Sequence, residues 1–178
     1  MKKKYNKIKQ GFSLVEVLIS LLVLSIGISS VLFLMTANTK NSINAKNQII
    51  ASGLAQEGIE LVRNLKDNNP ATFTTDITTQ NDYRIDYTFS YDAFRNSNNA
   101  SNAQKQLFLN GNGFYSHSNG VGAISTKFYR KISVSIATVS LKKVATITSY
   151  VSWNDSGIPA VCNVANKCVS VVAVLPDL

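Results

Sequence analysis

Residues 10–35 read QGFSLVEVLISLLVLSIGISSVLFLM, an apolar stretch that dominates the N-terminal part of the chain. Sixteen of the 24 residues from Phe12 to Met35 are Leu, Ile, Val or Phe, and one, Glu16, is charged. As a helix this segment is about 36 Å long, which exceeds the roughly 30 Å of hydrocarbon in a bilayer. The sequence therefore predicts a membrane-spanning helix with an acid near its start, which insertion tolerates but does not need.

The charges on either side of this stretch predict its orientation. Five lysines precede Gly11, whereas Lys40 and Lys46 are the only charges soon after the apolar run. The positive-inside rule places the N-terminus in the cytoplasm and the chain after about residue 36 outside. A cleaved secretory signal would have a shorter apolar stretch and an Ala-x-Ala site, which does not follow here. An uncleaved signal anchor is the simple alternative.

Composition limits what the rest of the chain does. The 178 residues carry a formal charge of +8, but without the five leading lysines it falls to +3. The basic balance therefore does not indicate a nucleic-acid-binding domain. The length suits one modest domain with an appendage, and the part beyond the apolar stretch is long enough to bury a core.

The junction between the leader and the apolar stretch carries a motif. A basic, polar leader ends at Gly11, and Phe12, three further residues and Glu16 follow before the long apolar run. This Gly-Phe-x-x-x-Glu junction resembles the prepilin-type cleavage site of type IV pilins and pseudopilins. In that family a membrane peptidase cuts after the Gly and usually N-methylates the new first residue. The resemblance implies cleavage between Gly11 and Phe12 and N-methylation of Phe12, and SLVEVLISLLVLSIGI is most similar to minor pilins of the PilV kind.

The resemblance also gives Glu16 a role. Cleavage would free a positive amine at Phe12, four residues before the carboxylate of Glu16. Opposite charges in a poorly solvated setting attract strongly, and each is costly alone. We expect Glu16 to pair with the amine of a neighbouring subunit, or with its own, during subunit assembly.

Partners and location follow from the same resemblance. It implies other pilin subunits, the prepilin peptidase and the inner-membrane assembly platform, with membrane lipid around the helix before assembly. The chain would sit in the cytoplasmic (inner) membrane as a single-pass protein with its N-terminus inside. It would then enter an extracellular pilus or a periplasmic pseudopilus.

We expect four segments along the chain. They are a leader peptide (1–11), the transmembrane and assembly half of a helix (12–35), its amphipathic half (36–66), and a globular domain of antiparallel sheet (70–178). Asn69-Pro70 ends the helix, because the residue before proline disfavours the α conformation. Gly53 and Gly58 weaken a helix, and close approach of strands is one reason to have them. The apolar stripe predicted to face the sheet comprises Ile43, Ile50, Leu54, Leu61 and Leu65, flanked by Ala51, Ala55 and Val62.

Beyond the helix the hydrophobic period changes to two, which predicts strands. The fold class is therefore α+β, a long N-terminal helix packed on an antiparallel sheet, as the pilin resemblance also implies. Residues 96–104 are predicted to be a polar loop. The predicted strands cover 83–91, a hairpin around the Asn-Gly turns at 106–118, 128–136, 144–153 and 169–175.

Few residues suggest other chemistry. The spacing of Cys162 and Cys168 favours a local disulfide over two free thiols. His117 is expected to be a solvated loop residue, and Asp82 and Asp86 to lie on a solvated sheet face. We find no catalytic or phosphate-binding motif and expect no enzymatic activity, cofactor or metal. Basic and aromatic residues interleave in a patch that could touch DNA, although a charged outer face is the simpler interpretation: Tyr129, Arg130, Lys131, Lys142 and Lys143.

The function most consistent with these patterns is that of a minor pilin, a structural subunit of a type IV pilus or related filament. One alternative is a minor pseudopilin of a type II secretion or competence system. Another is a membrane-anchored binding protein that never polymerises, which predicts an N-terminus with its lysines retained.

Overall fold

The computed structural model describes residues 13–77, 81–139 and 142–175. Tertiary contacts divide the chain into two compact units with their boundary inside the first helix: an N-terminal unit (Met1–Ile43) and a sheet unit (Asn44–Leu178). The elements in chain order are α1 (Leu14–Asn68), α2 (Pro70–Asp76), β1 (Asp82–Tyr83), α3 (Tyr91–Arg95), α4 (Asn102–Lys105), β2 (Gln106–Leu109), β3 (Tyr115–Ser116), β4 (Ile124–Val139), β5 (Lys142–Ser152) and β6 (Cys168–Leu175).

Helix α1 runs without interruption for 55 residues. It ends at Asn68 because Asn69 precedes a proline, and Pro70 then opens α2 at a position where its missing N–H is not needed. The long helix expected from the sequence is therefore confirmed over the described residues, and the predicted start at Phe12 lies outside them.

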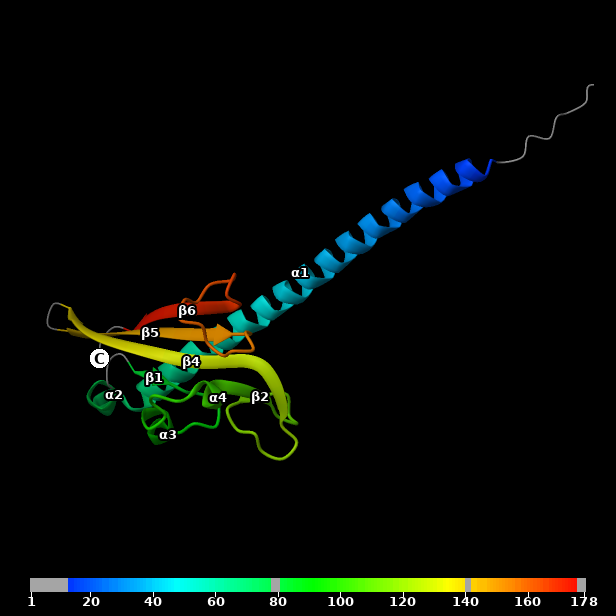
Figure 1. The fold of residues 1–178 in the computed structure, drawn as a ribbon. Helices are drawn as coiled ribbons and strands as arrows, with labels where there is room; N and C mark the ends of the chain where they lie inside the picture. The colour runs from blue at the N-terminus through cyan, green and yellow to red at the C-terminus, as the bar shows by residue number, and fades with distance from the viewer. Residues whose placement is uncertain (1–12, 78–80, 140–141, 176–178) are drawn as a thin grey trace, which may run out of the picture. The chain divides into compact units, whose positions relative to one another are not determined.

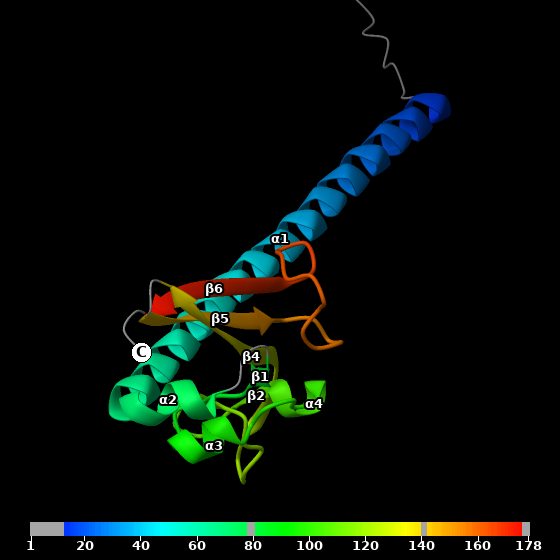
Figure 2. The same ribbon diagram turned by 90° about the vertical axis from the view of Figure 1, so that its left-hand side faces the viewer.

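Six antiparallel strands form one sheet in the described part of the chain, in the order β3-β2-β4-β5-β6, with β1 on β4. The long strands β4 and β5 pair from Tyr129 opposite Ser152 to Val139 opposite Lys142. In Figures 1 and 2, α2, α3 and α4 lie beside β1 and β2, on the side of the sheet unit away from β6. The α+β class, a long helix packed on an antiparallel sheet, is confirmed.

The second half of α1 covers one face of the sheet. Two apolar clusters fill the space between them, one around Ile59, Val62 and Ile132 and the other around Ala51, Leu54 and Trp153. The inward positions of β5 alternate as the sequence predicts. They are Ala145, Ile147, Val151 and, just after the strand, Trp153, all of them buried.

The buried face of α1 is rotated from the predicted stripe. Of the five stripe residues only Leu54 is buried, and Ile50, Leu61 and Leu65 are half-buried, whereas the predicted flanking residues are all buried: Ala51, Ala55 and Val62. The buried face is shifted toward the side that carries Ala51, Ala55 and Gly58. Its buried residues are, in order, Asn47, Ala51, Leu54, Ala55, Gly58, Ile59 and Val62. Small side chains face the sheet because the helix backbone approaches it closely.

Gly58 shows how close that approach is. A methyl group at this position would lie 2.7 Å from Ser149 Oγ and 3.1 Å from Ile132 Cδ1, whereas one at Gly53 would meet nothing within 4 Å. The expectation that glycine permits close strand approach is therefore confirmed for Gly58 and wrong for Gly53.

The strand predicted at 83–91 is wrong beyond Tyr83. The Asp86 carboxylate accepts hydrogen bonds from the backbone N–H and hydroxyl of Thr88, which turns the chain. Ser90 then caps α3 by accepting from Ala93 N. Such local side-chain bonds compete with a strand ladder, and here they win.

The loop predicted at 96–104 is also partly wrong. It contains the start of α4, where Ser101 and Gln104 form a reciprocal capping box. The other strand predictions are confirmed: the hairpin is β2–β3, and the three later segments lie in β4, β5 and β6.

Candidate functional site

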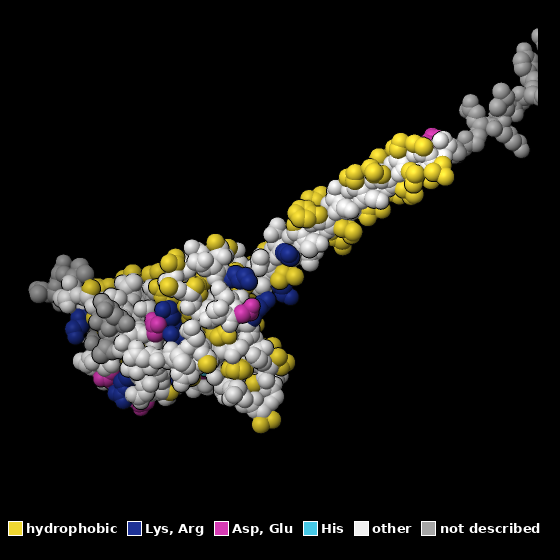
Figure 3. Space-filling view, in the orientation of Figure 1, with side chains coloured by type: hydrophobic (Ala, Val, Ile, Leu, Met, Phe, Trp, Pro, Cys, Tyr) yellow, Lys and Arg dark blue, Asp and Glu magenta, His cyan; other side chains and the backbone are white. Residues whose placement is uncertain are grey.

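The N-terminal unit presents apolar side chains around its whole circumference. Every Leu, Ile, Val, Phe and Met from Leu14 to Met35 is at least 47% exposed within the chain, and Figure 3 shows them as yellow side chains along this part of α1. The helix is long and apolar enough to cross a membrane, with a mean hydropathy of 2.7 over its most apolar window. Such a surface needs lipid or other helices around it.

Polar groups inside this apolar segment are satisfied within the helix itself. Six hydroxyl groups donate to the carbonyl oxygen four residues earlier, at distances of 2.7–2.9 Å. They belong to Ser20, Ser25, Ser29, Ser30, Thr36 and Thr39. Because lipid offers no hydrogen-bond partner, these internal bonds lower the cost of hydroxyl groups in a membrane.

Glu16 differs from these hydroxyl groups because it carries a charge. It lies in the first turn of α1, exposed, and is the sole charged residue in the sequence between Lys9 and Lys40. A carboxylate there is favoured by the positive end of the helix dipole, by a few tenths to about 1 kcal/mol. The predicted cleavage and methylation positions, Gly11 and Phe12, lie outside the described residues.

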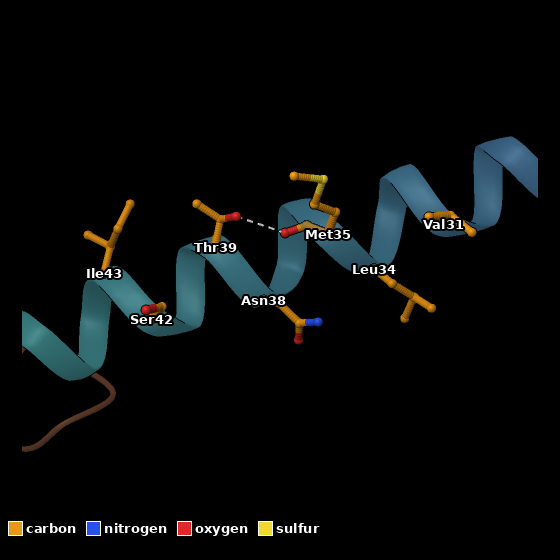
Figure 4. Close-up of a pocket in the computed structure, with 7 residues that line it drawn as sticks. All are labelled: Val31, Leu34, Met35, Asn38, Thr39, Ser42 and Ile43. Carbon is orange, nitrogen blue, oxygen red and sulfur yellow. Dashed lines mark hydrogen bonds between the residues drawn. The ribbon is translucent and has the colours of Figure 1, made fainter.

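An open groove runs along α1 near the end of the N-terminal unit. Figure 4 shows its lining, with Thr39 Oγ1 donating to Met35 O at 2.9 Å. The lining changes along the helix from Val31, Leu34 and Met35 to Asn38, Thr39, Ser42 and Ile43. Its polarity therefore rises where the apolar stretch ends, which is the pattern expected at the border between lipid and water.

A buried cation joins α1 to the sheet within the sheet unit. Arg130, on β4, is fully buried and donates to the backbone oxygens of Leu54 (3.1 Å) and Ile85 (2.6 Å). Its guanidinium lies 3.3 Å from the Glu57 carboxylate. Burial lowers the pKa of Arg130, and Glu57 opposes that shift. The guanidinium stays charged and holds the helix backbone against the sheet.

Three residues were expected on solvated surfaces. Asp82 is half-buried and pairs with Lys105 and Lys131, Asp86 is buried, and His117 is half-buried. Asp86 is 2% exposed and accepts from the backbone N–H of His117 at 2.7 Å. The imidazole Nδ1 lies 3.1 Å from Gln106 O, and desolvation by burial lowers the pKa of His117 to about 4. The prediction of a solvated His117 is wrong, because the turn that Asp86 organises folds its loop back against β2.

The basic and aromatic patch considered for nucleic acid does not form as a patch. Arg130 faces the core, and Lys131 lies 3.1 Å from Asp82, whose carboxylate also meets Lys105 at 3.3 Å. Lys131 Nζ stacks over the Tyr150 ring on the outer face of the sheet. The side chain of Lys142 is outside the described set. Arg130 and Lys131 therefore have partners within the fold, whereas Lys127 on β4 and Lys143 on β5 are exposed, so the two central cations of the patch do not add to a basic surface.

Cys162 and Cys168 form a disulfide with a Cα–Cα separation of 5.0 Å, as the sequence favoured. The ring between them is a tight turn with a left-handed residue at Lys167 (φ 56°). Cys168 N donates to Asn163 O, and Trp153 N donates to Lys167 O. The bridge thus fixes the point where β6 begins.

The comparison with known families identifies the N-terminal segment. The family model for the prokaryotic N-terminal methylation motif matches residues 6–32, a range that spans Gly11, Phe12 and Glu16. The chain carries a prokaryotic N-terminal methylation motif. This motif supports a type IV pilin-like protein, and it implies processing by prepilin peptidase and assembly with other pilins. Proteins with the motif are structural subunits. The comparisons with curated proteins and with solved structures gave no match.

The methylation motif was visible in the sequence, whereas the buried polar cluster was not recognised there. One signal could have found it. Arg130 shares the two-residue spacing of Phe128, Ile132 and Val134, so its side chain belongs to the inward row of β4. Nothing comparable in the local pattern marks Asp86 as buried.

Proposed function

We propose that this protein is a minor pilin, a structural subunit of a type IV pilus or a related filament. The observation that carries the proposal is the methylation motif at 6–32, which includes most of the apolar stretch 12–35 and Glu16, the single charge of that stretch. Prepilin peptidase cuts between Gly11 and Phe12 and methylates the Phe12 amine. The helix stays in the inner membrane until the assembly platform transfers it into a bundle of pilin helices.

Assembly rests on two physical effects. The apolar side chains of the N-terminal unit exchange lipid for neighbouring helices, so the gain comes from close packing rather than from water exclusion. The Glu16 carboxylate pairs with a Phe12 ammonium, which sets the axial register because an unpaired charge inside the bundle is costly. The sheet unit is carried on the outside.

The decisive experiment is mass spectrometry of the mature N-terminus. A chain that begins at Phe12 and carries one methyl group supports the proposal. A chain that retains the lysines of residues 1–11 rejects it and leaves a membrane-anchored binding protein.

A second experiment tests the role of Glu16. The fraction of the chain in sheared filaments is measured for Glu16→Gln, which removes the charge, and for Glu16→Asp, which keeps it. We expect a loss of about tenfold or more for Gln, equivalent to about 1.4 kcal/mol, and partial recovery for Asp. Lys40→Gln, a charge change beyond the apolar stretch, is the control. Equal incorporation of all variants would overturn the pairing role.

The same measurement addresses the second candidate, a minor pseudopilin. The orientation with the N-terminus inside is shared by both, as is processing at Gly11. A pilin appears in surface filaments that shear from the cell, whereas a pseudopilin remains in the periplasmic fraction.

A further inference from the structure

Three Asn-Gly pairs lie in the sheet unit between Lys105 and Lys127. They are Asn110-Gly111, Asn112-Gly113 and Asn119-Gly120. In such a pair the backbone nitrogen of the glycine can attack the side-chain amide carbon of the asparagine, because glycine has no Cβ to obstruct the approach. The three pairs share this local chemistry, so a difference in their reactivity must come from the structure around them.

The side chain of Asn110 is held by three hydrogen bonds. Its Oδ1 accepts from the backbone N–H groups of Asn112 (3.0 Å) and Phe114 (2.9 Å), and its Nδ2 donates to the Tyr87 hydroxyl at 2.5 Å. These bonds must break before the amide carbon can turn toward the nitrogen of Gly111. Asn110 is therefore protected by its own side-chain contacts.

Asn112 is exposed, but the nitrogen that would attack it is occupied. Gly113 N donates to Asn110 O at 3.0 Å, and Gly113 has a φ of 84° in the turn that this bond closes. The nitrogen attacks after it has lost its proton, and an N–H that donates a hydrogen bond loses its proton less readily. Asn112 is therefore protected through its neighbour.

Asn119 has neither form of protection. Residues 118–122 are all exposed, in the loop that precedes β4 in Figure 1. In the part of the chain that the structure describes, no hydrogen bond involves the Asn119 side chain or the Gly120 N–H, while the Gly120 carbonyl accepts from Ala123 N. Both reacting groups are thus open to water and hydroxide.

We propose that Asn119 is a site of spontaneous deamidation in the folded chain. Hydroxide removes the amide proton of Gly120, the nitrogen bonds to Asn119 Cγ, and the side-chain nitrogen leaves as ammonia after taking a proton from water. Water then opens the cyclic imide at either of its carbonyl carbons and leaves aspartate or isoaspartate. The net reaction consumes one water and releases one ammonia, without oxidation or reduction.

The product changes the charge of an uncharged segment. Residues 106–126 contain no Asp, Glu, Lys or Arg, so the new carboxylate is the first charged side chain in this range. A reacted copy therefore differs from a new copy in its surface charge. This modification goes beyond the proposed function, because no step involves the N-terminus or the apolar helix.

Isotope labelling of the full-length chain in detergent tests the proposal. The chain is incubated at mildly alkaline pH in water labelled with heavy oxygen, then unfolded and digested with trypsin in ordinary water. Opening of the imide incorporates the label, so labelled product formed before digestion. Cleavage after Lys105 and Lys127 releases a peptide that holds all three pairs, and fragmentation mass spectrometry assigns the label to individual asparagines.

The three asparagines of this peptide are internal controls for one another. Asn119 should gain label at least about tenfold faster than Asn110, since three hydrogen bonds must first break at Asn110. It should also react faster than Asn112. In denaturant the three should react at comparable rates, and a difference that persists unchanged there would overturn the structural assignment.

A variant tests the attacking nitrogen. In Gly120→Ala the added Cβ would lie 3.7 Å from Ser118 Oγ, an ordinary contact, so the fold is retained. This change should slow the labelling of Asn119 several-fold and leave that of Asn112 unchanged. The proposal is overturned if native Asn119 reacts no faster than Asn110, or if Gly120→Ala leaves its rate unaltered.

Discussion

The two halves of α1 share one helix but differ in how their side chains are covered. Up to Ile43 the apolar side chains are exposed, and the segment makes its polar bonds internally, from Ser and Thr hydroxyls to its own carbonyls. From Asn47 onward one face is buried, and it combines the small residues Ala51, Ala55 and Gly58 with larger apolar ones such as Leu54 and Ile59. The first half supplies surface for a partner outside the chain, and the second half already has its partner in the sheet.

The comparison shows that apolar content alone does not tell which part of a helix is buried in its own chain. Val23 is 62% exposed, whereas Val62 is fully buried. What distinguishes the second half is the close approach permitted by Gly58 and the guanidinium of Arg130 on the backbone of Leu54. Substitutions that should affect stability in one half of α1 but not in the other therefore test the comparison directly.

The largest effect is expected from removing the buried cation. Arg130→Ala should lower the free energy of unfolding by about 3–5 kcal/mol, because it leaves a cavity and the Ile85 carbonyl without its donor. Denaturant titration followed by fluorescence of the one tryptophan, Trp153, measures it on detergent-solubilised protein. The exposed Lys127→Ala on the same strand is the control. A loss below about 1 kcal/mol for Arg130→Ala would show that the cation does not hold the helix.

The next effect is a pH dependence that comes from the sheet unit. The pKa of His117 falls from 6.5 to about 4 in the folded chain, so the unfolded chain binds more protons between these values. Stability contributed by the neutral imidazole is present above pH 6.5 and is lost as the pH falls toward 4, by about 3 kcal/mol. His117 is the single histidine, so the difference between wild type and His117→Gln isolates its contribution from that of carboxyl groups. Parallel pH profiles for the two proteins would contradict the prediction.

A matched pair of valines gives the third effect. Val62→Ala should cost about 2 kcal/mol of unfolding free energy, since it removes buried methyl groups and leaves a small cavity. Val23→Ala makes the same chemical change on the exposed half and should alter unfolding of the sheet unit by less than about 0.5 kcal/mol. Equal losses at both positions would mean that the two halves unfold as one.

The smallest effect is expected from a matched pair of glycines. Gly53→Ala should stabilise the protein by about 1 kcal/mol, because alanine favours the helix and meets nothing. Gly58→Ala should destabilise it by about 1 kcal/mol, because the added methyl group presses on Ser149. Thermal unfolding of both variants beside the wild type measures the difference. Stabilisation by both would remove the argument for close approach.

Features that depend on neighbouring residues were predicted correctly from the sequence, whereas features that depend on contacts between distant residues were not. Strands β4, β5 and β6 and the hairpin β2–β3 were predictable, because their alternation and Asn-Gly turns are local signals. The segment 83–91 alternated equally well yet is not a strand past Tyr83. Its register depends on Asp86, whose carboxylate bonds reach Thr88 locally and His117 across the chain. A pattern of hydrophobicity does not contain that information.

The sequence by itself determined the methylation motif, the apolar helix and the lone Glu16 within its apolar stretch, since each depends on neighbouring residues and on the contrast between lipid and water. The stripe on the second half of α1 was predicted to centre on Ile50, Leu61 and Leu65, with Ala51, Ala55 and Val62 beside it, but the buried face centres on those flanking residues and Gly58. Only the tertiary structure decided that face and the burial of Arg130 and Asp86. The physical reason is that these features depend on which surfaces meet across the fold. A helix turns a different face inward when its backbone can approach the sheet closely and accept a hydrogen bond from a buried guanidinium.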